Sequence, residues 1–115
     1  MELREQTELL KRHLTRLKDI FEHSTPPENT KDKEFFQKVK EETNPVYQLL
    51  EEWEEAALEV VKARKAKVHP QQVTSTKENM ELVLMHSYYV DARRKRFMEL
   101  HNSILYVFDL LLSEI

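Results

Sequence analysis

Apolar side chains recur along the first part of the chain, residues 2–22, at the spacing of an α-helix. They follow one another in steps of seven, four, three and four residues, at Leu3, Leu10, Leu14, Leu17 and Phe21. Positions three or four apart lie on the same side of a helix, so these steps form a single apolar stripe. The residues between them are mostly charged, which predicts an amphipathic helix with one solvated face.

A second stripe runs through residues 31–65, after a break at two consecutive prolines, which cannot continue a helix. Thr30 is the expected N-cap of this helix. Pro45 interrupts the segment, but the stripe keeps its phase on both sides of Pro45, which predicts one helix kinked there. The alternative is a break, in which Asn44 caps a new helix and Pro45 takes its first position. The stripe comprises Phe35, Val39, Val46, Leu50, Trp53, Ala57 and Val60.

Trp53 is the largest member of this second stripe. It lies in phase with Leu50 and Val60, and the small side chains of Ala56 and Ala57 leave room beside it for a large ring. Large aromatic side chains dominate the energetics of protein cores. We therefore expect Trp53 to be buried at the centre of the fold.

Two further stripes complete the pattern. Residues 70–90 form the third predicted helix, with Pro70 in its first turn, where proline is tolerated. Residues 92–114 form the fourth. The third stripe comprises Val73, Met80, Leu84 and Ser87, and the fourth comprises Phe97, Leu100, Ile104, Phe108, Leu111 and Ile115.

The connections between the four predicted helices are short, so sequential helices should pack as antiparallel neighbours. We therefore expect an all-α fold, an up-and-down antiparallel four-helix bundle whose second helix is kinked near Pro45. A length of 115 residues fits a single domain spanning 1–115. Glycine is absent from the chain, which excludes glycine-rich phosphate loops and glycine-based hairpin turns.

Composition narrows the class of protein further. The formal net charge of −3 argues against a general binder of polyanions. Without cysteine the chain has neither disulfides nor thiolate nucleophiles. The first residues lack the apolar core of a signal peptide, and the longest nearly apolar run, 104–112, is about half of the roughly 20 residues that a membrane helix needs. We expect a cytoplasmic protein that uses no cofactor.

A series of residues from position 31 to the C-terminus follows the order of a known bacterial family. These residues are Phe35, Phe36, Trp53, Ala57, Leu58, Glu59, His69, Glu81, Leu82, Val83, Leu84, Ser87, Tyr88, Lys95, Arg96, Phe97, Ser103, Leu105, Tyr106, Glu114 and Ile115. In this order they resemble the YppE-like family, small uncharacterised proteins of Gram-positive bacteria. Residues 2–22 resemble the family only in their amphipathic character. The resemblance implies an up-and-down four-helix bundle, and it implies no activity and no site residues.

The sequence holds no motif for catalysis or metal binding. No histidine has a glutamate three residues before it, which is the pair that di-metal bundles use, and no two histidines stand four residues apart. One constellation could form between facing helices: His86 and His101 with Glu81 or Glu59. Hydrogen-bonded histidines at the core boundary are the simpler interpretation. Ser87 follows His86 directly, and adjacent helical residues point about 100° apart, which excludes a nucleophile–base pair. We expect neither an enzyme nor a metal site.

Basic residues gather near the end of the second predicted helix and at the start of the fourth. The first group comprises Lys62, Arg64, Lys65 and Lys67, and the second comprises Arg93, Arg94, Lys95 and Arg96. Up-and-down topology would place the two groups at opposite ends of the bundle, separated by about 30 Å for a 20-residue helix. The simplest interpretation is that these cations offset helix carbonyl dipoles and acids of the same chain. The alternative is that Arg93–Arg96 bind nucleic acid or an acidic partner, with Tyr88 and Tyr89 near enough to stack on bases.

Apolar residues also occur where an amphipathic bundle would be polar. Leu82, Met85 and Tyr89 lie nearly opposite the main stripe of the third predicted helix, at about 100° per residue. Tyr106 and Leu110 lie away from the main stripe of the fourth. These side chains are covered either by the protein's own chain or by another protein, because exposed apolar patches mark interaction surfaces.

Two hypotheses of function follow. The first is a non-enzymatic protein–protein interaction module that uses the apolar surplus to bind a partner protein or a second copy of itself. The second is a nucleic-acid-associated protein that uses its basic helix ends. A strong dependence of binding on salt would favour the second.

Overall fold

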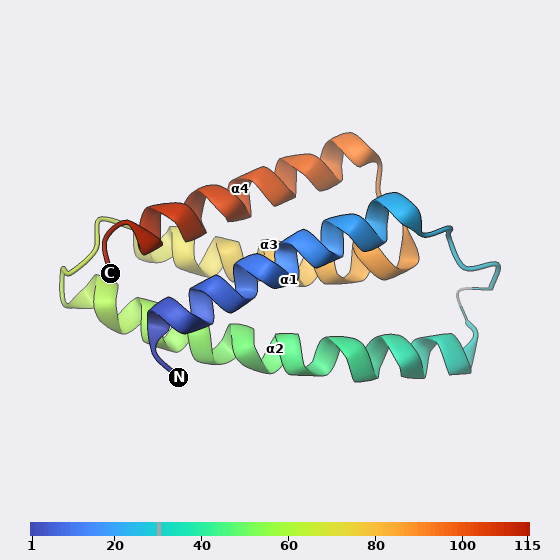
Figure 1. Cartoon of the computed structure of the whole chain (residues 1–115), viewed down its shortest axis with the longest axis horizontal. Helices are drawn as coiled ribbons and strands as arrows, with labels where there is room; N and C mark the ends of the chain where they lie inside the picture. The colour runs from blue at the N-terminus through green and yellow to red at the C-terminus, as the bar shows by residue number, and fades with distance from the viewer. Residues whose placement is uncertain (30) are drawn as a thin grey trace.

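The computed structural model describes residues 1–29 and 31–115, and within them it contains four α-helices and no strand. The helices are α1 (Leu3–His23), α2 (Lys33–Lys62), α3 (Pro70–Tyr89) and α4 (Arg94–Leu112). They run alternately in opposite directions, so that each packs antiparallel to the next (Figure 1). The prediction of an all-α, up-and-down four-helix bundle is confirmed.

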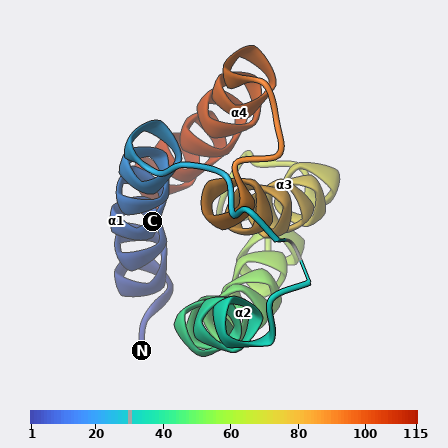
Figure 2. The same ribbon diagram turned by 90° about the vertical axis from the view of Figure 1, so that its right-hand side faces the viewer.

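The helices are not arranged as a regular square. α1 and α3 each pack against all three other helices, and they lie between α2 and α4 when the bundle is seen end-on (Figure 2). The backbones of α2 and α4 therefore face each other across the core. Across residues 1–29 and 31–115, each helix is too short or too polar to span a bilayer.

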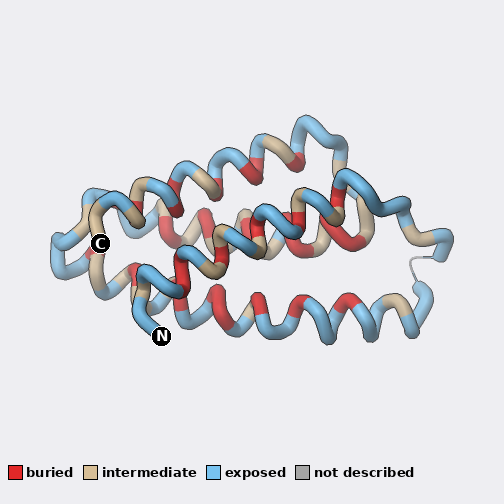
Figure 3. Tube along the Cα trace, in the orientation of Figure 1, coloured by how far each residue is buried: buried red, intermediate tan, exposed pale blue. Residues whose placement is uncertain are grey.

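Trp53 occupies the centre of the core, as predicted. Its side chain has 0% exposure, and its indole Nε1 donates a hydrogen bond to Thr7 Oγ1 of α1 at 3.0 Å. Its ring meets Phe108 of α4 edge-on, with 5.4 Å between centroids. One side chain of α2 thus contacts both α1 and α4. The buried positions face inward along all four helices (Figure 3).

α1 and α4 are held together along their whole length. Near one end the rings of Phe21 and Phe97 are stacked, with centroids 4.1 Å apart. In the middle Lys11 Nζ lies 2.6 Å from Asp109 Oδ1. At the other end Arg4 donates to the Leu112 carbonyl at 3.2 Å, and also to the carbonyl of the final residue. This pairing brings the two chain termini to the same end of the bundle (Figure 1).

α2 is one helix across Pro45, so the alternative of a break at Asn44 and Pro45 is wrong. The bend expected at Pro45 stays a prediction. The N-cap of α2 is Asp32, whose carboxylate accepts from Glu34 N at 3.0 Å. Thr30, which we expected as the N-cap, lies outside the described residues.

Two helices end earlier than predicted because a residue turns left-handed. α2 closes with Arg64 at φ 57°, where Arg64 N donates to Val61 O and Lys65 N donates to Val60 O. This is a Schellman motif, in which glycine usually takes the left-handed position. α3 closes with Val90 at φ 49°. Left-handed geometry is costly for residues other than glycine, and this chain has no glycine to use.

We expect Trp53→Ala to lower the free energy of unfolding by about 3–5 kcal/mol, the range for a buried aromatic truncated to alanine. The loss combines a cavity with the broken contacts to Thr7 and Phe108. Urea denaturation followed by circular dichroism measures it. Phe36→Ala is the matched control, because Phe36 is 57% exposed and should lose far less. A loss below about 1 kcal/mol for Trp53→Ala would show that the ring does not organise the core.

We expect Arg64→Gly to raise the free energy of unfolding by about 0.5–1 kcal/mol. Glycine removes the cost of left-handed geometry, about 1–2 kcal/mol, which stabilises the folded protein. Its greater freedom in the unfolded chain destabilises the folded protein by about 0.4–1 kcal/mol, which offsets part of the gain. Lys65→Gly is the control, because Lys65 has a negative φ and gains nothing from glycine. Equal effects of the two substitutions in urea denaturation would contradict this account of the turn.

Candidate protein-interaction surface

The outer side of α3 carries the apolar residues that the sequence placed nearly opposite the main stripe of this helix. The buried residues of α3, among them Val73 and Met80, face the core. At about 100° per residue, Leu82 lies about 180° from Val73, on the side turned away from the core. Leu82 is 42% exposed there.

Met85 and Tyr89 lie on the same side of α3 and are half-buried against the core. Tyr89 is covered in part by α2, because its ring meets Phe35 edge-on with centroids 5.3 Å apart. The next residue of α2, Phe36, is 57% exposed. The structure therefore places the apolar back of α3 beside the start of α2.

The contact between α2 and α3 continues at Tyr47. This side chain is half-buried, and burial raises the pKa of its hydroxyl, with a further contribution from the nearby Glu81 carboxylate. Tyr47 and Glu81 thus lie close together across the two helices. We define the α2–α3 outer face by five side chains: Phe36, Tyr47, Leu82, Met85 and Tyr89.

The charges around the α2–α3 outer face are mainly negative. Three carboxylates lie one helical turn from an apolar member of the face: Glu78 before Leu82, Glu81 before Met85, and Glu51 after Tyr47. A fourth carboxylate, Glu54, is paired with Lys77 at 3.7 Å and adds no net charge. Lys33 and Lys40, one turn before and after Phe36, are the cations placed in the same way, and the Asp32 carboxylate near them accepts from Glu34 N. An apolar centre with an acidic rim is suited to a basic amphipathic partner.

Tyr106 and Leu110, which the sequence grouped with this surface, belong to a different side of the bundle. Tyr106 is 64% exposed and lies about 180° from the buried Phe97 on α4. Leu110 is half-buried against the core. α4 lies on the far side of α3 from α2 (Figure 2). The structure therefore does not join these two residues to the α2–α3 outer face.

The basic patch Arg93, Arg94, Lys95 and Arg96 is exposed at the start of α4. This end of α4 lies beside the last turns of α1 and α3 (Figure 1). Arg94 pairs with Glu22 at the end of α1, with 3.1 Å between Nη2 and Oε1. The other basic group, near the end of α2, lies at the opposite end of the bundle, as predicted. Arg94, Lys95 and Arg96 form the first turn of α4, where the helix dipole disfavours cations, whereas the C-terminal ends of α1 and α3 favour them, so the Arg94–Glu22 pair is the intramolecular role that the structure supports.

The histidines considered for a metal site have other contacts. His86 Nδ1 lies 2.7 Å from Asp91 Oδ1, and the buried His101 lies 3.4 Å from Asn102 Oδ1. Within residues 1–29 and 31–115, no three His, Asp or Glu side chains are placed to share a metal ion. His86 and His101 are thus not assembled with Glu81 or Glu59, and the absence of a metal from the protein stays an expectation. Ser87 donates to the Val83 carbonyl at 2.6 Å, a structural role within α3.

Two features of the surface were missed in the sequence. Phe36 follows Phe35 directly, and two adjacent aromatic residues on a helix cannot both face the core, which is the signal that could have found it. The second missed feature is a cleft between the end of α1 and the start of α2. It combines residues from three helices and a connection, so no local pattern reveals it.

Comparison with known proteins supports the resemblance noted from the sequence. A family model described as "Bacterial domain of unknown function (DUF1798)" matches residues 7–115. The match thus includes most of α1, beyond the part that the sequence pattern suggested. The chain is also 32% identical, over 83 residues, to the uncharacterized protein YppE of Bacillus subtilis (strain 168), which covers 71% of this chain and 68% of YppE.

Solved structures of the same relative have the same fold. The crystal structure of YppE from Bacillus subtilis aligns with this chain at a TM-score of 0.86 and 29% identity. The alignment covers 98% of this chain and 91% of the YppE chain. The solution NMR structure of YppE aligns at a TM-score of 0.76 and 27% identity, over 97% of this chain and 90% of the YppE chain. The arrangement of four helices is therefore shared along almost the whole chain.

Proposed function

The chain belongs to the bacterial family of the domain of unknown function DUF1798, and we propose that it is a non-enzymatic protein-interaction module. Its partner in this proposal is a basic amphipathic helix of another protein, bound along the α2–α3 outer face. The observation that carries the proposal is the exposure of Leu82 and Phe36, at 42% and 57%, on a face that has carboxylates beside Leu82, Met85 and Tyr47.

The apolar part of the face supplies the energy of binding. Leu82, Met85 and Tyr89 are aligned at i, i+3 and i+7, the spacing at which one helix presents a stripe to another. Covering side chains of this size contributes roughly 1.5–3 kcal/mol each when they start fully exposed, and less for those already half-buried. Association costs offset part of this gain, so the face suits a transient complex.

The acidic rim supplies selectivity. Glu51, Glu78 and Glu81 would attract the lysines and arginines of a partner helix and repel an acidic one. Such rim charges act mainly on the rate of association and weaken with salt. The α4 patch, in contrast, already has Arg94 paired with Glu22, which makes nucleic acid the weaker candidate.

We expect a labelled model peptide with leucine on one helical face and lysine on the other to bind, measured by fluorescence anisotropy. A peptide of the same pattern with glutamate in place of lysine should bind at least tenfold more weakly. Leu82→Glu should weaken binding of the lysine peptide tenfold or more, because a charge then occupies the apolar centre. Since Leu82 is exposed, the fold should survive the substitution.

Tyr106→Glu is the matched control. It places the same charge at a more exposed apolar residue outside the α2–α3 outer face, and it should leave the affinity within about twofold. Equal losses for the two variants would contradict the proposal, because the peptide would then respond only to net charge. A concentration-dependent dimer in sedimentation that Leu82→Glu dissolves would also overturn it, in favour of a second copy as the occupant.

A further inference from the structure

The connection between α2 and α3 carries four cations within a short stretch of chain. They are Lys62, Arg64, Lys65 and Lys67, and all four are exposed. The sequence has no acid between Glu59 and Glu78. We call these four residues the basic turn.

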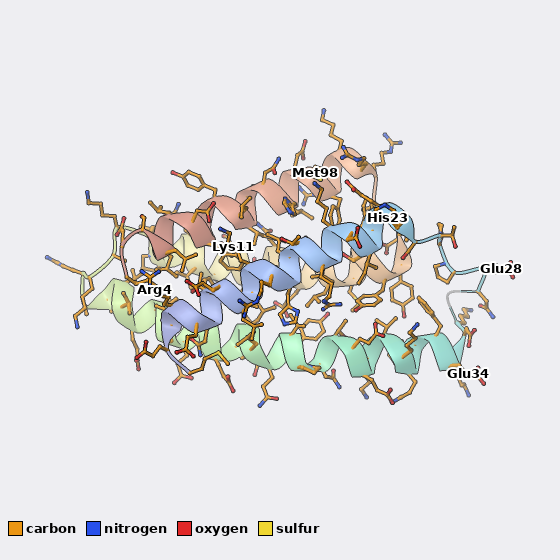
Figure 4. The ribbon with its side chains drawn as sticks, in the orientation of Figure 1. Arg4, Lys11, His23, Glu28, Glu34 and Met98 are labelled. Atoms are coloured by element: carbon orange, nitrogen blue, oxygen red, sulfur yellow. The ribbon has the colours of Figure 1, made fainter. Side chains whose placement is uncertain are left out.

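The basic turn projects from one end of the bundle. It lies in the yellow-green connection at the end where α1 begins and α4 finishes (Figure 1). Figure 4 shows Arg4 at this end of the molecule, and Glu28 and Glu34 at the opposite end. The left-handed backbone of Arg64 turns the chain sharply away from α2. A partner can therefore approach the turn without the movement of a helix.

The positive charge of the basic turn is only partly offset by acids of the same chain. Across the part of the chain that the structure describes, none of the four side chains forms an ion pair. Two acids lie near them: Glu59, one helical turn before Lys62, and Glu114, which reaches the turn from beyond the end of α4. Four cations against these two acids leave a surplus of two positive charges.

The charges next to the turn balance one another and do not remove this surplus. Arg4 and Arg12 lie one helical turn on either side of Glu8, and Arg4 also donates to the carbonyl of the final residue. Lys77 is paired with Glu54 at 3.7 Å. The helix dipoles also offset one another, because α1 and α3 begin at this end of the bundle and α2 and α4 finish there.

The basic turn already holds a carboxylate of its own chain. The backbone N–H of Lys67 donates to a carboxylate oxygen of Glu114. Around this contact is a surface depression of about 370 Å³, lined by Arg64, Lys65, Ala66, Lys67 and Glu114. The turn is therefore suited to carboxylates, which gain strength from hydrogen bonds to charged donors.

The surroundings of the turn favour a short acidic segment over a long polyanion. Between Lys40 and Lys62, α2 has no cation and seven acids: Glu41, Glu42, Glu51, Glu52, Glu54, Glu55 and Glu59. A nucleic-acid strand that extended past the turn along α2 would be repelled by these acids. Residues 54–87 also contain no Phe, Tyr or Trp on which bases could stack.

We propose that the basic turn docks a short acidic segment of a partner protein, whose carboxylates lie against Arg64, Lys65 and Lys67. The planar guanidinium of Arg64 is suited to a bidentate contact with a carboxylate, and the lysines act as point charges. Leu82 lies twelve residues after Pro70, about 18 Å along α3. The basic turn is thus separate from the α2–α3 outer face, and the inference does not depend on the proposed function.

A labelled hexaglutamate peptide is a suitable probe. We expect it to bind in fluorescence anisotropy, more weakly as salt rises, and to shift the ¹⁵N amide resonances of Arg64, Lys65 and Lys67 in the full chain. A thymidine hexanucleotide should bind at least threefold more weakly, because its bases find no ring to stack on. Equal or tighter binding of the oligonucleotide would overturn the proposal in favour of nucleic acid. Shifts confined to Arg93–Arg96 would place the peptide at the other basic group and would also overturn it.

Two double variants separate the basic turn from net charge: Lys65→Glu with Lys67→Glu, and Lys33→Glu with Lys40→Glu. All four lysines are exposed, so both double variants should keep the fold, and they change the net charge equally. The first should weaken hexaglutamate binding tenfold or more, and the second should leave it within threefold. Equal losses would refute the site. Dimers in sedimentation that only the first double variant dissolves would also refute it, because the occupant would then be the acidic α2 of a second copy.

Discussion

The bundle depends on the burial of one indole ring. Trp53 reaches from α2 to Thr7 of α1 and Phe108 of α4, so three helices meet on a single side chain. A buried indole N–H is costly unless it has an acceptor, and Thr7 supplies one while its own hydroxyl donates to the Leu3 carbonyl at 2.7 Å. This chain of hydrogen bonds fixes the rotation of α1 about its axis, and hence which of its residues face α4.

α3 fills the space between the three helices that Trp53 connects. It packs against all the other helices, which explains why it is apolar on more than one side. A helix with three neighbours still has an outer side, and on α3 that side carries Leu82 between Glu78 and Met85. Packing inside the bundle accounts for Met85 and Tyr89, which are half-buried, but it does not account for Leu82. The case for a partner therefore depends on the most exposed of the three.

The sequence predicted the elements far better than the sites. The apolar stripes and prolines are local signals, and they located all four helices and the buried Trp53. The ends of α2 were misjudged because they depend on backbone geometry that periodicity does not report, a cap at Asp32 and a left-handed turn at Arg64. Helical geometry placed Leu82 on the outer side of α3, but it could not show which helix lies beside it. That required the packing of α2 against α3, which also brought in Phe36.

The absence of glycine has a consequence for folding as well as for the turns. Each residue with a β-carbon samples fewer backbone conformations in the unfolded chain than glycine does, so less conformational entropy is lost when the helices form. Contacts between sequential antiparallel helices are also close in sequence, a feature that favours folding on the microsecond-to-millisecond scale. The strained turns at Arg64 and Val90 are thus a local cost of having no glycine. In return, the unfolded chain has less conformational entropy to lose, and its folding should be correspondingly fast.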